Sequence, residues 1–299
     1  MARAKSNGID LEYETFGDAG DRPLLLIAGL GAQMISWDED FCGHLAARGF
    51  HVIRFDNRDS GLSMRMEEAG FPDMVAAFSG NPQPAYQLDD LADDAVGLLD
   101  ALGIGAAHVV GASMGGFIAQ LVALNHPDRV LSLTSIMSGP GGEDEVAPKP
   151  EGAAVLTVSP QTTREERLKQ ALWIRQTLLG SGDPFDESSE LARVSRAVDR
   201  AYYPVGVGRQ LVAILAAKSR LERLKDLRVP TLVIHGVDDV LVPVENGRLV
   251  AEAVPGARWM EVDGMGHVVP RRVWPQVMDA IDAIAREANL SKGRSNPAG

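Results

Sequence analysis

Five short apolar runs, separated by segments with helical spacing, constrain the fold of this chain more than any other feature. They cover residues 23–29, 51–56, 107–111, 131–137 and 231–236. Strands that are covered by helices on both faces do not need to alternate apolar and polar side chains. We therefore predict that these runs are buried strands of a mostly parallel sheet.

The segments between these runs predict helices. In residues 88–102 the leucines and alanines recur at helical spacing, acidic residues occupy the first turn, and Gly103 stands where a C-terminal cap belongs. Such alternation of strands and helices predicts a doubly wound α/β domain. Residues 9–17 alternate instead, and we expect them to form an antiparallel edge strand of a hairpin.

The strand rhythm stops after Met137 and resumes near Val229. Residues 138–152 are rich in Gly, Pro and acidic residues, and the chain from 160 to 225 has helical patterns without a clear strand. We expect a helical cap, or lid, at 141–225, inserted between two strands of a core that comprises residues 1–140 and 226–290. The polar residues 291–299 predict a disordered tail.

Composition excludes several classes of function. The 299 residues carry a net charge of −12 and no Lys/Arg-rich run, which disfavours a nucleic-acid partner. No uninterrupted apolar stretch is long enough to span a membrane. The single cysteine, Cys42, is expected to be a small buried hydrophobe and fits a reducing compartment. With no secretory-type apolar segment near the start, we expect a cytoplasmic protein; oligomeric state is not indicated.

The sequence GASMG, residues 111–115, lies between a predicted strand and an apolar helical segment. A hydroxyl at this position does not stabilise a hydrophobic core, and the flanking glycines destabilise both the strand and the helix. The pattern G-x-S-x-G is typical of a sharp strand-to-helix turn that exposes Ser113 as a nucleophile. The N–H groups at the start of the helix then face any anion that forms beside the hydroxyl.

A serine nucleophile needs a base, and the base needs an orienting acid. Ligands in open parallel sheets bind beyond the carboxyl ends of the strands. There the chain places His267, in a glycine-containing loop after a strand, and two adjacent acids, of which we favour Asp239 over Asp238. The other five histidines fall on predicted strands or helices, where a structural role is expected.

The same chemistry needs two donors for the oxyanion. One is expected to be the backbone N–H of Met114, and the other comes from the loop after the first apolar run, where we choose Leu30. The histidines and acids lack the spacing of metal ligands, so neither a metal nor a cofactor is expected. Five side chains are candidates to line the substrate pocket: Trp37, Met137, Trp173, Tyr202 and Tyr203.

These motifs resemble the serine α/β-hydrolases. Together, HVIRFDNRDSGLS, AHVVGASMGG, VPTLVIHGVDDVLVP and GMGH are similar to the branch that contains aclacinomycin methylesterase. The resemblance implies cofactor-free hydrolysis of a carboxylic ester, on a fairly apolar small molecule, through an acyl-serine intermediate. By position it implies Ser113 as nucleophile, Asp239 as acid, His267 as base, and Leu30 with Met114 as oxyanion amides. Many relatives read D-x-R-G-x-G where this chain has DNRDSG at residues 56–61, with Asp59 in place of the first glycine; Asp56 and Arg58 are expected to be structural, tying the loop down.

Other functions of the same fold stay open at this point. Lactonases and cofactor-free haloperoxidases share SMGG, and a C–C bond hydrolase or a perhydrolase is a further alternative. A hydrolase-like receptor with little turnover would keep the three residues. A nucleotide site at Gly29 and Gly31 is disfavoured, since Met34 stands where the third glycine of G-x-G-x-x-G belongs.

Overall fold

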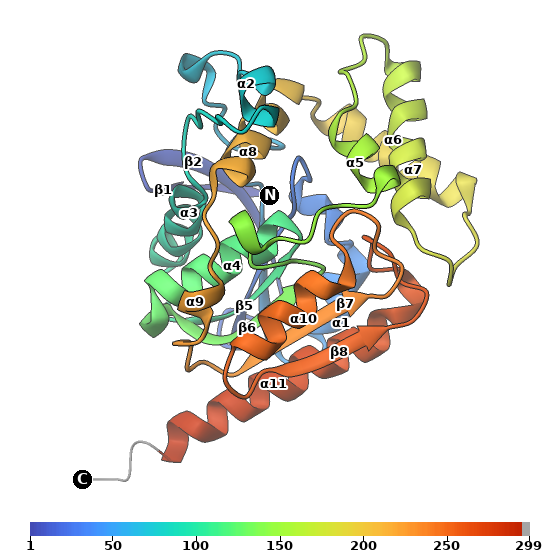
Figure 1. Cartoon of the computed structure of the whole chain (residues 1–299). Coiled ribbons are helices and arrows are strands. Elements are labelled where there is room, and N and C mark those ends of the chain that lie inside the picture. Colours follow the sequence, from blue (N-terminus) through green and yellow to red (C-terminus); the bar gives the residue numbers. More distant parts are fainter. Residues whose placement is uncertain (295–299) are drawn as a thin grey trace.

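An eight-stranded sheet organises the structure, a computed structural model that describes residues 1–294, with only the backbone described for 291–294 (Figure 1). Its strands are β1 (Ala2–Ser6), β2 (Ile9–Phe16), β3 (Arg22–Ile27), β4 (Phe50–Phe55), β5 (Ala107–Ala112), β6 (Val130–Ile136), β7 (Thr231–Gly236) and β8 (Arg258–Val262). They are ordered β1-β2-β4-β3-β5-β6-β7-β8. The strands from β4 to β8 are parallel, and β2 is antiparallel to both its neighbours.

Helices bury both faces of this sheet. Side chains of α1 (Glu39–Ala46) and α11 (Trp274–Arg294) pack on one face, and those of α3 (Leu88–Ala101), α4 (Met114–Asn125) and α10 (Val244–Ala253) pack on the other. Successive side chains of a strand point to opposite faces. Leu24 of β3 accordingly joins the α1/α11 layer, whereas Leu25 joins the α3/α4 layer. Burial on both faces explains why the strands are apolar without alternation.

The five predicted strands are confirmed as β3, β4, β5, β6 and β7, with ends shifted by at most two residues. The predicted helix at 88–102 is confirmed as α3, and Gly103 follows it with a φ of 69°. One detail was wrong. Residues 9–16 form β2 of a hairpin, but the edge of the sheet is β1, a short and mostly exposed strand whose pattern gave no signal.

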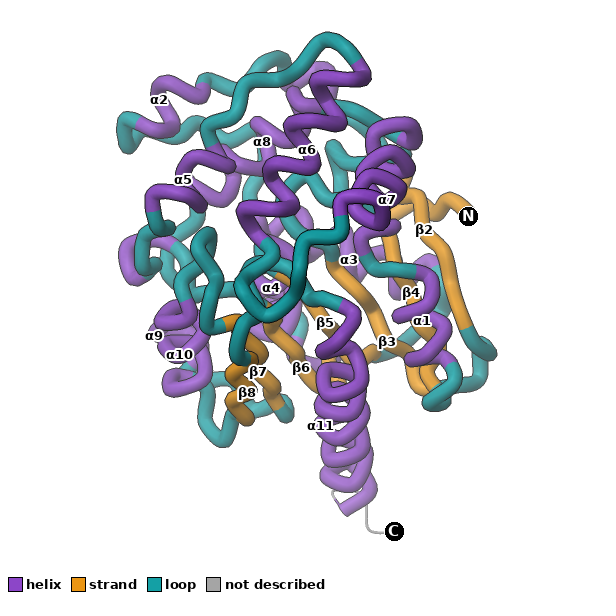
Figure 2. The backbone as a smooth tube through the Cα atoms, turned by 90° about the vertical axis from the view of Figure 1, so that its right-hand side faces the viewer, coloured by secondary structure: helices purple, strands orange, loops and turns teal. Residues whose placement is uncertain are grey.

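The chain between β6 and β7 contains five α-helices and no strand. They are α5 (Pro150–Leu156), α6 (Arg164–Leu178), α7 (Glu187–Arg200), α8 (Pro204–Ala216) and α9 (Leu221–Leu224). Figure 2 shows α5 to α8 gathered at one end of the strands, next to the short α2 (Met74–Phe78), while α11 extends away at the other end. None of the described helices is long and apolar enough to cross a membrane.

The tail predicted at 291–299 starts too early. Helix α11 continues through residue 294. Residues 295–299 lie outside the described residues.

Cys42 lies on α1 and is fully buried in the α1/α11 layer, which confirms the expectation of a small buried hydrophobe. Burial raises the pKa of its thiol to about 12. The side chain therefore stays neutral and packs as a small hydrophobe.

The loop after β4 is tied down by its own charged residues. Asp56 accepts hydrogen bonds from the backbone N–H groups of Met34 (2.6 Å) and Leu62 (2.9 Å). Arg58 donates from Nε and Nη2 to the two oxygens of Asp94 on α3, both at 2.7 Å. Asp56 and Arg58 thus make the structural contacts that were expected of them.

Removing one partner of the buried Arg58–Asp94 pair should destabilise the fold. In Arg58→Met the Asp94 carboxylate, 1% exposed, is left without its guanidinium. We expect the free energy of unfolding, measured by urea denaturation, to fall by about 3–5 kcal/mol. The matched control is Arg164→Met, which breaks the solvent-exposed pair with Asp199 and should leave the urea midpoint nearly unchanged. Equal effects of the two variants would contradict the expectation.

Candidate active site

The sheet brings the predicted residues to one edge. Strand β3 lies between β4 and β5, so the chain order reverses at the β3/β5 pair, a topological switch point where α/β sheets bind ligands. Leu30 follows β3, and Ser113 directly follows β5. Asp239 comes after β7, and His267 lies in the loop after β8. All four strands are parallel, so all four residues emerge at their carboxyl ends.

Ser113 occupies the sharp turn between β5 and α4. Its φ is 56°, a value that residues with a Cβ rarely adopt and that stores strain. The turn is held by a hydrogen bond from the Ser113 N–H to Ile136 O, 2.9 Å. A Cβ on Gly111 would lie 1.9 Å from Gly115 O, and one on Gly115 would lie 2.2 Å from Ile27 O. Both glycines are therefore required by the close approach of backbones.

Three of the predicted side chains form one hydrogen-bonded chain. His267 Nε2 lies 2.8 Å from Ser113 Oγ, and His267 Nδ1 lies 2.7 Å from Asp239 Oδ2. A carboxylate only accepts hydrogen bonds, so Nδ1 carries the proton and donates it to Asp239. Nε2 is then the acceptor for the Ser113 hydroxyl. In this tautomer the imidazole is placed to take a proton from the serine.

Asp239 is fully buried, and its charge is satisfied on every side. Besides His267, Oδ1 accepts from the N–H groups of Leu241 (2.9 Å) and Val242 (2.8 Å). Burial acts to raise the pKa of Asp239, but electrostatic attraction to the His267 ring and hydrogen bonds from His235 and His267 outweigh it and hold that pKa well below its usual value. The ionised form is thus the one that orients the imidazole.

The structure separates the two candidate acids. Asp238 points to the inserted segment, where its Oδ2 accepts hydrogen bonds from the backbone N–H (2.8 Å) and the hydroxyl of Ser181. Asp239 alone of the two contacts His267. A second histidine was not singled out by its sequence context: His235, buried in β7, has Nε2 3.5 Å from Asp239 Oδ2 and 2.8 Å from Val242 O. The position of His235, four residues before Asp239, was the sequence feature that could have indicated this contact.

Ser113, Leu30 and Met114 line one cavity of about 410 Å³. That volume lies within the range of small-molecule sites. Its walls are mostly apolar and come from α4, the chain that follows β6, α8 and the loop after Asp239. They include Phe117, Val146, Pro148, Leu156, Leu211, Ile214, Leu215 and Leu241.

The five aromatic and methionine candidates for this pocket were wrong, since none lines the cavity. Trp37 is buried and stacks on Phe41, with ring centroids 5.9 Å apart, and Trp173 is 42% exposed. The size and hydrophobicity of a side chain therefore did not predict which residues line the cavity. A better signal was the spacing of Leu211, Ile214 and Leu215 on one stripe of α8.

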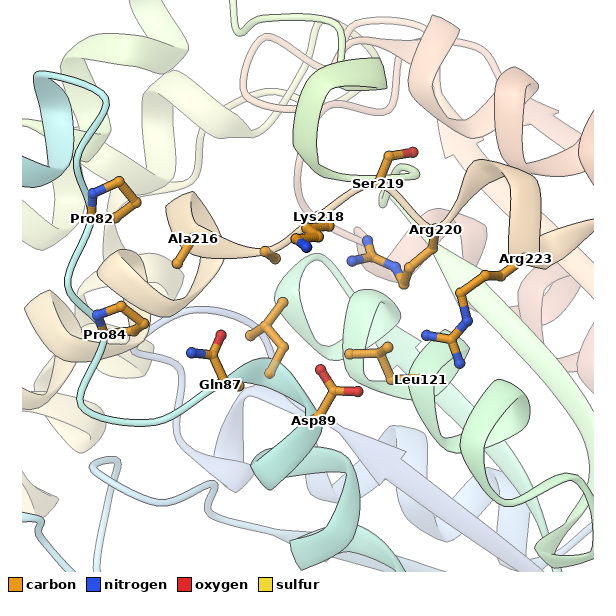
Figure 3. Close-up of a pocket in the computed structure, with 12 residues that line it drawn as sticks. Pro82, Pro84, Gln87, Asp89, Leu121, Ala216, Lys218, Ser219, Arg220 and Arg223 are labelled. Carbon is orange, nitrogen blue, oxygen red and sulfur yellow. The ribbon is translucent and has the colours of Figure 1, made fainter.

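A second, larger cavity of about 600 Å³ adjoins the first, since Ala217 and Lys218 line both. Figure 3 shows the residues that line this second cavity. It is bounded by Pro82 and Pro84 before α3, by the end of α8, and by Arg220 and Arg223. None of the five predicted site residues lines it, so size does not identify the site. Among the described residues, no group of three His, Cys, Asp or Glu side chains could hold a metal ion.

Fold and site together define a class of protein. Residues 22–270 match the family described as alpha/beta hydrolase fold, and the chain belongs to that family.

Within this family, the chain is similar to several individual proteins. The chain is 34% identical to rhodomycin D methylesterase from a Streptomyces species and 33% identical to the enzyme of that name from Streptomyces peucetius; each match covers 94% of this chain and 97% of the relative. Among solved structures, an enol-lactonase from Burkholderia xenovorans superposes with a TM-score of 0.74 at 24% identity, over 95% of this chain and 99% of that one. At that identity the likeness concerns the fold.

The close approach at the turn can be tested through stability. In Gly111→Ala the new Cβ meets backbone atoms that cannot rotate away. We expect the free energy of unfolding to fall by at least about 2 kcal/mol. The control Gly43→Ala adds the same methyl group to an exposed site on α1 with nothing within 4 Å, and should raise stability by up to about 1 kcal/mol. Urea denaturation of both variants checks this, and a neutral Gly111→Ala would show that the backbones are not in contact.

Proposed function

We propose that this protein hydrolyses a carboxylic ester of a fairly apolar small molecule through an acyl-serine intermediate. The observation that carries the proposal is the hydrogen-bonded chain Ser113–His267–Asp239 at the wall of an apolar cavity. Two methylesterases among the relatives support a methyl ester as the first substrate to test.

In the proposed acylation, Ser113 Oγ attacks the ester carbonyl while His267 Nε2 takes its proton. Asp239 holds the imidazole and stabilises its positive charge. The tetrahedral oxyanion is bound by the backbone N–H groups of Leu30 and Met114. His267 then gives its proton to the departing alcohol oxygen as the C–O bond breaks.

Deacylation repeats these steps with water as the nucleophile. His267 Nε2 removes a proton from the water that attacks the acyl carbonyl, the same two amides bind the oxyanion, and Ser113 leaves with the proton from His267. No step requires an added cofactor.

We also propose that residues 141–225 act as a cap on a core that comprises residues 1–140 and 226–290. Support comes from Leu156 of α5 and Leu211 of α8, which line the same cavity as Ser113. Substrate selection would then depend on this segment. The single buried cysteine supports a reducing compartment, such as the cytoplasm, as the place of action.

Replacing the nucleophile should abolish turnover. For Ser113→Ala we expect kcat on p-nitrophenyl acetate or a methyl ester to fall by roughly 10⁶-fold. Labelling by a fluorophosphonate, mapped to its peptide, should be lost as well. The control Ser181→Ala changes an exposed serine and should keep both signals. A loss of less than about tenfold in Ser113→Ala would refute the proposal, and absence of turnover by the unaltered protein would favour a receptor.

The two adjacent acids allow a second test. In Asp239→Asn an amide N–H can face His267 Nδ1, which forces the proton onto Nε2 and removes the acceptor for Ser113. We expect kcat to fall by about 10⁴-fold. The control Asp238→Asn alters the neighbour that contacts Ser181 and should keep kcat within about twofold. Steady-state kinetics on both variants decides whether Asp239 is the acid, and the reverse ranking would reassign that role.

A further inference from the structure

Helix α8 packs directly on the oxyanion loop, defined here as residues 28–34. Gly31 in this loop has a φ of 63°, and a Cβ there would lie 2.9 Å from Val207 of α8. One turn further along the helix, Gln210 Oε1 accepts a hydrogen bond from the Gly31 N–H at 2.9 Å. The inserted segment therefore contacts the peptide bond that follows Leu30.

Both ends of the Gln210 amide are used. The side chain is fully buried, and its Nε2 donates to Arg58 O at 2.7 Å. The amide thus joins the oxyanion loop to the loop after β4. Because a buried amide that lost either partner would leave a polar group unsatisfied, its position is strongly fixed.

Contacts from the core hold other atoms of the same loop. Asn57 Nδ2 donates to Ala28 O at 3.0 Å, and Ser60 Oγ donates to Ala32 O at 2.8 Å. These bonds fix the loop before and after the Leu30–Gly31 peptide. Gln210, from the inserted segment, is the side chain that bonds that peptide itself.

We propose that Gln210 is a positioning residue for the oxyanion site. By fixing the Leu30–Gly31 peptide it restricts rotation about Leu30 and so aims the Leu30 N–H at the position the oxyanion will occupy. The inference rests on the proposed function, in which Leu30 donates to that oxyanion. Oxyanion donors act through preorganisation, at 2.7–3.1 Å from the developing charge. A loosened donor therefore weakens the transition state more than substrate binding.

The test is the variant Gln210→Met, which keeps the length of the side chain and removes both hydrogen bonds. Complete loss of one oxyanion donor costs about 10²–10³-fold in kcat, so a misaimed donor should cost on the order of tenfold, with KM changed less than about twofold. The rate of fluorophosphonate labelling should fall in parallel, because the phosphoryl oxygen occupies the same site. The final labelled fraction should equal that of the unaltered protein, since the fold is intact.

A second variant and a control separate positioning from general damage. Gln210→Asn keeps an amide, but its side chain is too short to reach Gly31. It should show the same loss of kcat, although the position remains polar. The control Gln120→Met removes an equally buried amide outside the oxyanion loop, on α4, where Nε2 donates to Ser135 Oγ and Gly139 O and makes no hydrogen bond to the Leu30–Gly31 peptide. It should keep kcat within about twofold.

The outcomes are distinguishable. Unchanged kcat and labelling rate in a folded Gln210 variant would overturn the positioning role while leaving the proposed function intact. A reduced final labelled fraction at an unchanged labelling rate would assign Gln210 a purely structural role, and would also overturn it. Activity that survives Ser113→Ala would refute the proposed function first.

Discussion

The hydrogen bond between His267 and the buried carboxylate of Asp239 is the contact on which the site depends. Asp239 has no exposed surface, and an unpaired charge there would strongly destabilise the fold. Two backbone N–H groups satisfy one of its oxygens, and His267 satisfies the other. This contact holds the loops after β7 and β8 together and places His267 Nε2 2.8 Å from Ser113 Oγ.

At the turn that carries Ser113, packing contacts again position a side chain of the site. The strained backbone of Ser113 persists because neighbouring strands over-determine it: Gly111 and Gly115 allow β5, α4 and β3 to approach within backbone contact, and Ile136 O accepts the Ser113 N–H. Strain in this turn keeps the hydroxyl in the cavity rather than in the core. The close packing of β5, α4 and β3 therefore also fixes the position of the Ser113 hydroxyl.

Features set by local sequence or by chain order could be predicted without coordinates. The apolar runs gave five strands, and their parallel order placed Ser113, Asp239 and His267 at one edge. The edge strand β1 was missed because a two-stranded hairpin can close the sheet with little apolar signal. The pocket walls were missed because the direction in which α6 or α8 faces depends on contacts between distant segments, such as Gly31 with Val207. Trp173 is large and apolar, yet 42% exposed for this reason.

One face of α8 contacts both the loop that carries Leu30 and the cavity. Val207 and Gln210 touch the loop that carries Leu30, whereas Leu211 and Ile214, one turn further along, line the cavity. Residues at i, i+3, i+4 and i+7 share one face of a helix, so the cavity wall and the amide that holds the loop belong to the same helix face. A shift of α8 to admit a bulkier group must displace Gln210 as well. The cavity wall and the loop that carries Leu30 are therefore coupled through this helix, and a substitution that shifts α8 changes both.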